Sequence, residues 1–160
     1  MDDDAAERFR TGLQTLKPRR APKLHWTESD GRHRMQVVEH LLLHEWRGLA
    51  VVGLYDTAVK SERRRRLTLE RMLVELIGVG VGRVVLESRG PADRSDRAHV
   101  DALKAQRVLR GLRVDHRPGA AEPLLWAADA VCGLVGRARQ EEPRFLEAVR
   151  HRLEVVENRR

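Results

Sequence analysis

Hydrophobic positions along the chain follow two alternating spacings, one typical of amphipathic helices and one typical of buried strands. In residues 61–77 the apolar side chains recur every three or four positions, which places Leu69, Met72, Leu73, Leu76 and Ile77 on one helix face. Residues 47–55 instead form a continuous apolar run with the length of a strand. The pattern predicts helices at 3–16, 30–45, 61–77, 94–109, 122–139 and 143–151, and strands at 23–26, 47–55, 83–87, 112–116 and near 153–156.

This alternation of strands and helices predicts an α/β fold. Strands that are apolar throughout are typical of parallel sheets, because helices cover both faces of such a sheet. We therefore expect a central mixed, mostly parallel sheet of about five strands, flanked by helices on both faces. Since neither a low-complexity linker nor an internal repeat interrupts the sequence, we expect a single domain over residues 1–160.

Charge adds a candidate partner to this picture. The chain has 31 Lys and Arg against 24 Asp and Glu, a net charge of +7 and a pI near 10.6, which favours nucleic acid. A GC-rich genome also produces arginine-rich proteins, so the charge has a second explanation. The acidic N-terminus is unlike a secretory signal, and the longest apolar run, 124–135, is too short to cross a bilayer. We expect a cytoplasmic protein with no membrane partner, and Cys132 as an inert buried thiol.

Acidic residues lie where the expected strands end. Asp56 follows the strand at 47–55, and Glu87 closes the strand at 83–87. Open α/β sheets bind ligands beyond the carboxyl ends of their strands, so Asp56 and Glu87 are candidate catalytic residues. An ion pair between Glu87 and Arg89 explains the position of Glu87 equally well.

Asp129 lies in a helix that is apolar on nearly all sides, so we expect its side chain to be buried. An unpaired buried carboxylate costs about several kcal/mol, so we expect it to meet a cation or to take up a proton. A divalent metal ion held by Glu87 and Asp129, with Glu122 two turns earlier, is one solution. An arginine partner, or a place on an exposed edge of the helix, explains Asp129 without a metal, and Glu122 also suits an ordinary helix N-terminus.

A run of four arginines begins at Arg63, in the first turns of the helix at 61–77. Cations at this end oppose the helix dipole by about a few tenths of a kcal/mol each, so contacts with phosphate are one explanation. An ordinary solvated helix face is the other. The sequence predicts a nucleic-acid surface formed by Arg63, Arg64, Arg66, Arg89 and Arg117.

Two segments of the chain resemble a known family. The strand Arg-Val-Val-Leu-Glu-Ser-Arg-Gly (83–90) and the helix Glu-Pro-Leu-Leu-Trp-Ala-Ala-Asp-Ala-Val-Cys-Gly (122–133) resemble short bacterial hypothetical proteins. These are similar to the domain of unknown function 3800 family, and the resemblance covers most of residues 22–156. It implies a ribonuclease-H-like fold and a nuclease site for magnesium or manganese, with acids on a first strand, a later strand and a late helix. Glu87 and Asp129 match the second and third of these acids.

The family's first acidic strand has no counterpart in this sequence, which begins with the helix at 3–16. Either the natural chain begins earlier, or this member has lost its first metal ligand, for which only Asp56 is placed to substitute. Two metal ions need several carboxylates, so a site with Glu87 and Asp129 alone is under-ligated. We expect a ribonuclease-H-like protein that binds or acts on nucleic acid, with an incomplete catalytic site. The alternatives are a non-catalytic nucleic-acid-binding module and a protein-interaction or toxin-type subunit.

Overall fold

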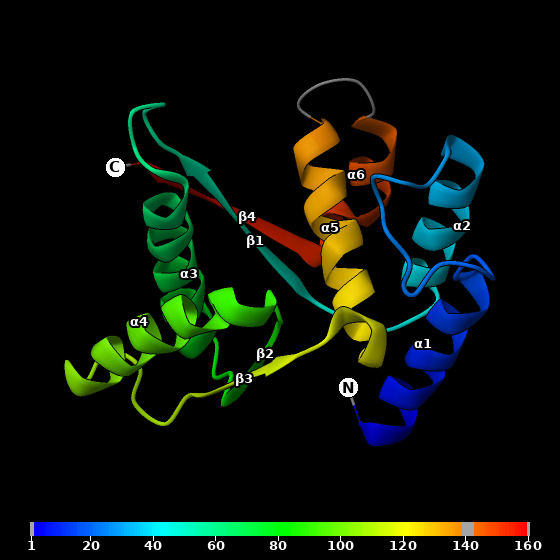
Figure 1. The fold of residues 1–160 in the computed structure, drawn as a ribbon. Coiled ribbons are helices and arrows are strands. Elements are labelled where there is room, and N and C mark those ends of the chain that lie inside the picture. The colour runs from blue at the N-terminus through cyan, green and yellow to red at the C-terminus, as the bar shows by residue number, and fades with distance from the viewer. Residues whose placement is uncertain (1, 139–142, 160) are drawn as a thin grey trace. The chain divides into compact units, whose positions relative to one another are not determined.

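The computed structural model describes residues 2–138 and 143–159, and the chain forms two compact units. Unit 1 consists of residues 1–48 and 118–154, and unit 2 consists of residues 49–117 and 155–160. Figure 1 shows the elements of both units along the chain. Two segments that are distant in sequence therefore build unit 1, and the middle of the chain builds most of unit 2.

Four helices build unit 1. They are α1 (Asp3–Leu16), α2 (Gly31–Leu42), α5 (Leu124–Ala138) and α6 (Pro143–Val149), which the 3₁₀ turn η3 (Arg150–Arg152) follows. Helix α1 packs on α2 and α5, and α6 packs on the same two helices. The side chains of Asp2 and Asp30 cap α1 and α2, because each accepts a hydrogen bond from a backbone N–H in the first turn. The predicted helix at 3–16 is confirmed to the residue.

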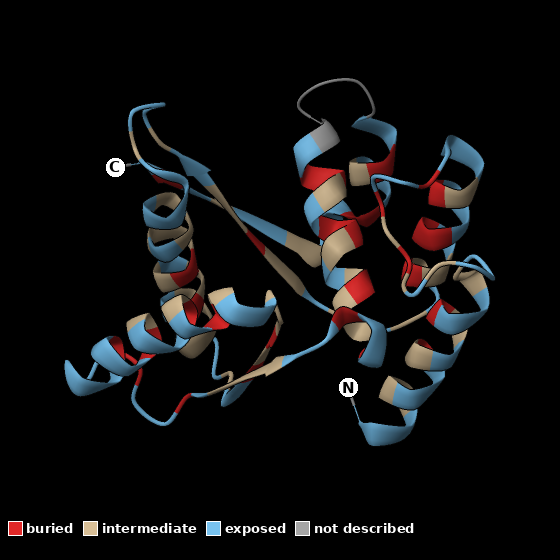
Figure 2. Ribbon diagram, viewed as in Figure 1, coloured by how far each residue is buried: buried red, intermediate tan, exposed pale blue. Residues whose placement is uncertain are grey.

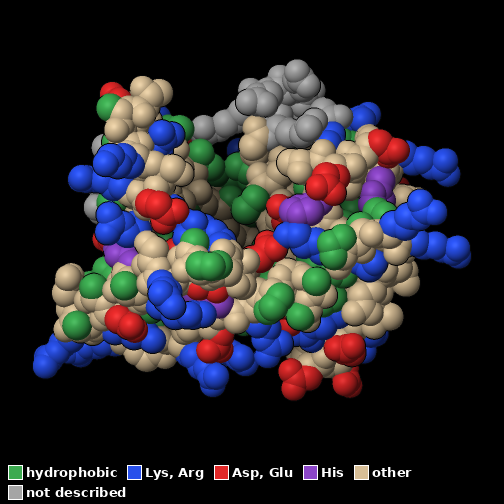
Figure 3. Space-filling view, in the orientation of Figure 1, with side chains coloured by type: hydrophobic (Ala, Val, Ile, Leu, Met, Phe, Trp, Pro, Cys, Tyr) green, Lys and Arg blue, Asp and Glu red, His purple; other side chains and the backbone are tan. Residues whose placement is uncertain are grey.

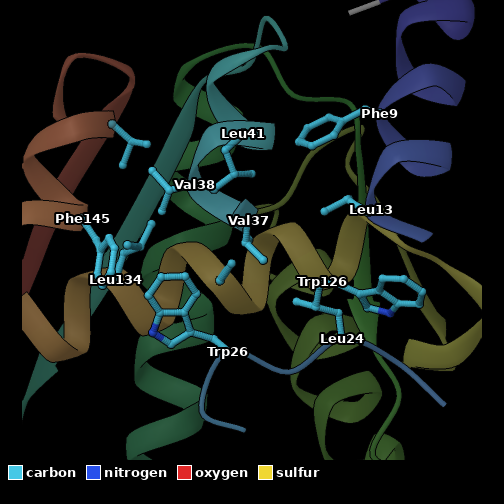
Figure 4. Packing of buried hydrophobic residues seen from close by; sticks show 12 residues of the cluster. Phe9, Leu13, Leu24, Trp26, Val37, Val38, Leu41, Trp126, Leu134 and Phe145 are labelled. Atoms are coloured by element: carbon cyan, nitrogen blue, oxygen red, sulfur yellow. The ribbon is translucent and has the colours of Figure 1, made fainter. Parts of the chain in front are cut away.

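Large aromatic side chains fill the core of unit 1 (Figure 4). Trp26, Trp126 and Phe145 are each at most 3% exposed, and aliphatic side chains from α1, α2 and α5 surround them. Gly133 lies directly against the ring of Trp26, and a Cβ at this position would overlap the ring. The glycine therefore allows the indole to pack against the backbone of α5.

The segment at 23–26 is not a strand, contrary to the prediction. It crosses unit 1 as a loop whose Leu24 and Trp26 side chains are 1% exposed. Buried side chains two residues apart look like one face of a strand, which explains the error. The backbone N–H of Trp26 is satisfied by the carboxylate of Asp129, 3.0 Å away, instead of by a neighbouring strand.

Unit 2 contains two helices and two small sheets. Helices α3 (Ser61–Gly78) and α4 (Asp93–Ala105) pack together, and the 3₁₀ turn η1 (Gly90–Ala92) leads into α4. Strand β1 (Gly48–Leu54) pairs with β4 (Leu153–Arg159), and β2 (Arg83–Glu87) pairs in parallel with β3 (Arg113–Arg117). The 3₁₀ turn η2 (Gly119–Ala121) lies beyond β3, at the return to unit 1.

The core of unit 2 is aliphatic, and its buried residues are red in Figure 2. The stripe predicted on α3 is confirmed: Leu69 and Leu73 are buried, and Met72, Leu76 and Ile77 pack against the same cluster. Strand β2 adds Val84 and Leu86, and α4 adds Val100 and Leu103.

The protein is thus a mixed α/β structure with a small parallel sheet, but the expected central sheet of five strands is wrong. Its four strands, within residues 2–138 and 143–159, form two separate pairs. The four helices of unit 1 bury their apolar faces against one another, where we expected them to cover a sheet. No helix in the described ranges is long and apolar enough to cross a membrane.

Candidate functional site

A fully buried carboxylate is the centre of an ion-pair network in unit 2. Asp96 of α4 has 0% of its side chain exposed and is held by two arginines. Arg65 of α3 donates to both of its oxygens, at 3.0 and 2.7 Å, and Arg89 donates at 3.1 Å. Arg65 therefore binds Asp96 through a two-bond fork, the geometry that a guanidinium and a carboxylate favour.

Asp93 extends this network to the turn after β2. Its carboxylate accepts hydrogen bonds from the hydroxyl of Ser88 and the backbone N–H of Arg89, both at 2.7 Å. Nε2 of His116, on β3, lies 3.6 Å from Asp96. The network thus fixes the turn beyond the carboxyl end of β2 to the start of α4.

Both carboxylates of the network are ionised. Burial opposes the ionisation of Asp96, but the hydrogen bonds and charge of Arg65, aided by Arg89, outweigh it and lower its pKa. Hydrogen bonds from Ser88 and from the backbone of Arg89 lower the pKa of Asp93. Glu62 adds an ion pair to Arg89 at 2.9 Å on the exposed side. The two arginines therefore face a set of three carboxylates.

A signal for this network is present in the sequence, although it does not lie at the end of a strand. Asp93, Asp96, Val100 and Leu103 recur at helical spacing, so two carboxylates stand on the apolar face of α4. Acids at core positions require buried cations. That the cations are Arg65 and Arg89 follows only from the packing of α3 against α4.

The two acids of the predicted metal site belong to different units. Glu87 is the half-buried last residue of β2 in unit 2, in register with Arg117 of β3. Asp129 is on α5 in unit 1, where it accepts a hydrogen bond from Trp26 and lies 3.4 Å from Nδ1 of His25. Their shared site remains a prediction.

The expected burial of Asp129 is wrong, since 35% of its side chain is exposed. Helix α5 turns Trp126, Ala130 and Leu134 into the core, and Asp129 lies at the margin of that face. Cys132 is also exposed, so the expectation of a buried thiol is wrong as well. Because α5 is apolar in composition, its sequence does not reveal that one side of the helix is exposed.

Glu122 and Asp56, the other two candidate acids, have local partners. Glu122 is 7% exposed, forms an ion pair with Arg10 at 2.9 Å, and accepts from the backbone N–H of Leu124 at the start of α5. Asp56 is exposed and accepts from the backbone N–H of Ala58 at 2.7 Å, which closes a turn after β1. No group of three or more His, Cys, Asp or Glu suited to a metal ion occurs in the part of the chain that the structure describes.

The arginine run at the start of α3 divides into two pairs with different roles. Arg64 donates to the carbonyl oxygens of Val59, at 2.6 Å, and Thr57, at 3.3 Å, and Arg65 holds Asp96. Arg63 and Arg66 are exposed on the other side of the helix. Of the predicted nucleic-acid residues, Arg64 and Arg89 thus have structural roles, whereas Arg63 and Arg66 point to solvent; Arg117 is exposed at the end of β3.

Arg63 and Arg66 belong to an open hollow at the start of α3. Lys60 completes a set of three cations at its rim, together with Glu62, and the small apolar side chains of Ala58, Val59 and Leu67 form the rest of the lining. The carboxylate of Glu62 is turned toward Arg89, with which it is paired. The hollow therefore presents three cationic side chains to solvent.

Charge is distributed very unequally between the two units. Unit 2 contains 17 Lys and Arg against 10 Asp and Glu, whereas unit 1 contains 14 of each. The whole net charge of +7 therefore belongs to unit 2. Figure 3 shows Lys and Arg side chains in blue over the region of α3 and α4, with several Asp and Glu side chains in red among them.

Comparison of the chain with protein-family models, with curated proteins and with solved structures gave no match in any of the three.

Proposed function

We propose that the protein binds nucleic acid through unit 2 and that this binding does not depend on catalysis. The observation that carries the proposal is the concentration of the entire net charge in unit 2. A GC-rich genome would enrich arginine throughout a chain, but it gives no reason for one unit to be neutral and the other strongly basic. A basic unit of this kind attracts a polyanion over long distances.

The hollow at the start of α3 is the proposed centre of the contact. Arg63 and Arg66 are three residues apart on one side of α3, and Lys60, the residue just before the helix, lines the same hollow. The turn before them is fixed at two points, by Asp56 through Ala58 and by Arg64 through Val59. A fixed turn lowers the entropy that is lost when the cations bind phosphate.

The proposal is tested by the salt dependence of binding. A variant with Lys60→Gln, Arg63→Gln and Arg66→Gln removes three contacts, and each contact with a duplex phosphate contributes about −0.9 to the slope of log K against log salt. We expect the slope to become shallower by about 2 to 3. The matched control, Arg19→Gln, Arg20→Gln and Arg32→Gln, removes three exposed arginines of unit 1 and should leave the slope unchanged. Equal slopes in the first variant and the parent protein, or no binding at low salt, would refute the proposal.

A second candidate is a divalent-metal-dependent nuclease with a ribonuclease-H-like fold. The succession α3, β2, α4, β3 and α5, with β2 parallel to β3 and Glu87 at the carboxyl end of β2, favours it. Magnesium or manganese would be held by Glu87 and Asp129, with Asp56 or Glu122 as a further ligand. Glu122 is already paired with Arg10, and Asp129 with the backbone of Trp26, so this donor set suits a metal poorly. A non-catalytic protein of the cytoplasm is the function that we favour.

A further inference from the structure

Aromatic side chains are almost confined to unit 1. All three Trp and both Phe of the chain belong to it, and Phe9, Trp26, Trp126 and Phe145 are buried in its core. Proteins that bind single-stranded nucleic acid usually stack the bases on exposed aromatic rings, at about 1–3 kcal/mol per base. The basic unit 2 therefore lacks most of the side chains for this mode of recognition.

Tyr55 is the one Phe, Tyr or Trp residue of unit 2. Its hydroxyl is hydrogen-bonded to Thr68 of α3 at 3.1 Å and to Asn158 of β4 at 2.6 Å. Asn158 is itself 6% exposed and donates to the carbonyl oxygen of Leu67. The Tyr55 hydroxyl thus links β4 to α3. If the ring of Tyr55 turned outward to stack on a base, these hydrogen bonds would be lost.

The exposed cations of unit 2 are suited to phosphate. Lys60, Arg63 and Arg66 surround a lining of apolar side chains that offers neither an aromatic ring for stacking bases nor an amide for reading adenine. A duplex carries one phosphate charge per about 1.7 Å of its axis, against about 3.4 Å for one strand. A surface that contacts only phosphate should therefore prefer the duplex.

We infer that unit 2 binds the phosphate backbone of double-stranded nucleic acid, without reading the sequence of its bases. The inference rests on the proposed function and names the class of nucleic acid. It follows from a basic surface whose described residues offer no exposed aromatic ring. Arginine can read guanine in the major groove, so the comparison of two duplex sequences tests this part of the inference directly.

The experiment compares a labelled duplex of mixed sequence with a thymine homopolymer of the same length by fluorescence anisotropy. We expect the full chain to bind the duplex several-fold more tightly at every salt concentration, and to bind a second duplex of permuted sequence equally well. The Tyr55→Phe variant, which keeps the ring and removes the hydroxyl, should not change the ratio of the two affinities. A homopolymer bound as tightly as the duplex, or a clear difference between the two duplexes, would overturn the inference and leave nucleic-acid binding intact. Failure to bind either probe at low salt would overturn the proposed function itself.

Discussion

Units 1 and 2 differ in how their cores are held together and in what their surfaces present. Unit 1 is electrically neutral and packs four helices around Trp26, Trp126 and Phe145. Unit 2 carries the whole excess of positive charge, has an aliphatic core, and buries Asp96 with its arginine partners. The net charge of +7 is therefore the charge of unit 2 and does not describe unit 1.

The buried ion pairs give unit 2 a different sensitivity from that of unit 1. Aromatic side chains in unit 1 bury large apolar areas, and this contribution to stability needs no charged partner. A buried carboxylate is stabilised only while its cations stay in place, and removal of one partner leaves an uncompensated charge. Since all three Trp lie in unit 1, their fluorescence reports on that unit, while circular dichroism reports on both.

The largest effect on this comparison should come from Arg65→Ala. After this substitution, only Arg89 is left to pair with the buried carboxylate of Asp96. Loss of one partner of a buried ion pair lowers the free energy of unfolding by about 3–5 kcal/mol. We expect thermal unfolding followed by circular dichroism to shift far more than tryptophan fluorescence. The neighbouring Arg63→Ala, at an exposed position of the same helix, is the control and should leave both transitions nearly unchanged. Identical large shifts in both probes for Arg65→Ala would show that the two units unfold as one.

The Gly133→Ala substitution should produce the opposite pattern. The added Cβ overlaps the ring of Trp26, which is 1% exposed, and overpacking of this kind costs about 1–3 kcal/mol. Gly136→Ala is the matched control on the same helix, since nothing lies within 4 Å of a Cβ there, and it should stabilise α5 by up to about 1 kcal/mol. We expect the tryptophan transition to fall for Gly133→Ala and to rise for Gly136→Ala. A rise in both would mean that the indole moves aside without cost.

Acidification should weaken unit 1 before unit 2. The ring of His44 stacks on that of Phe9, with the ring centroids 4.6 Å apart. Burial is the main cause that lowers the pKa of His44 below the ordinary 6.5, and the nearby His40 and Arg8 lower it further. The unfolded chain therefore takes up a proton at a higher pH than the folded one, and stability falls as the pH drops below about 6.5. The pKa values of Asp93 and Asp96 are lowered from 3.8, so their contribution is present above that pH and is lost only as the pH falls further.

We expect the tryptophan transition to shift to a lower temperature between neutral pH and about pH 5, and His44→Gln to remove most of this shift. The matched variant His99→Gln, in unit 2, should keep it. A pH dependence that is the same in both variants would assign the effect to other groups.

Hydrophobic spacing was sufficient to predict most elements but not their assembly. Helices 3–16 and 61–77 and strand 83–87 were found within a residue of their true limits, because each has a clear periodicity and a clear end. Periodicity shows that a helix has a buried face, however, and does not show which element covers that face. The pattern therefore predicts that the helices at 30–45 and 122–139 cover a sheet, whereas in the structure they pack on other helices.

The candidate site was predictable only in part, because charge pairing depends on tertiary contacts. The run from Arg63 looked uniform in sequence, yet the positions of Asp96 and Val59 in space decide that Arg65 and Arg64 turn inward. Asp129 looked buried because its helix is apolar, and only the path of the 23–26 loop explains its hydrogen bond to Trp26. Arg63 and Arg66 are exposed cations, as the sequence predicts for a solvated helix face or a phosphate-binding surface.

The smallest expected effect is none: the protein should not cleave nucleic acid in the presence of magnesium or manganese. A two-metal site needs several carboxylates, some of which bridge the ions, and the available set is small. Glu122 is paired with Arg10, and Asp129 with the backbone of Trp26. Asp56, the one substitute for the family's first acid, closes its own turn.

The assay uses single-stranded, double-stranded and hybrid substrates, with Glu87→Gln and Asp129→Asn as paired variants. Robust cleavage that both variants abolish would contradict the prediction and would direct the search for a third ligand to Asp56.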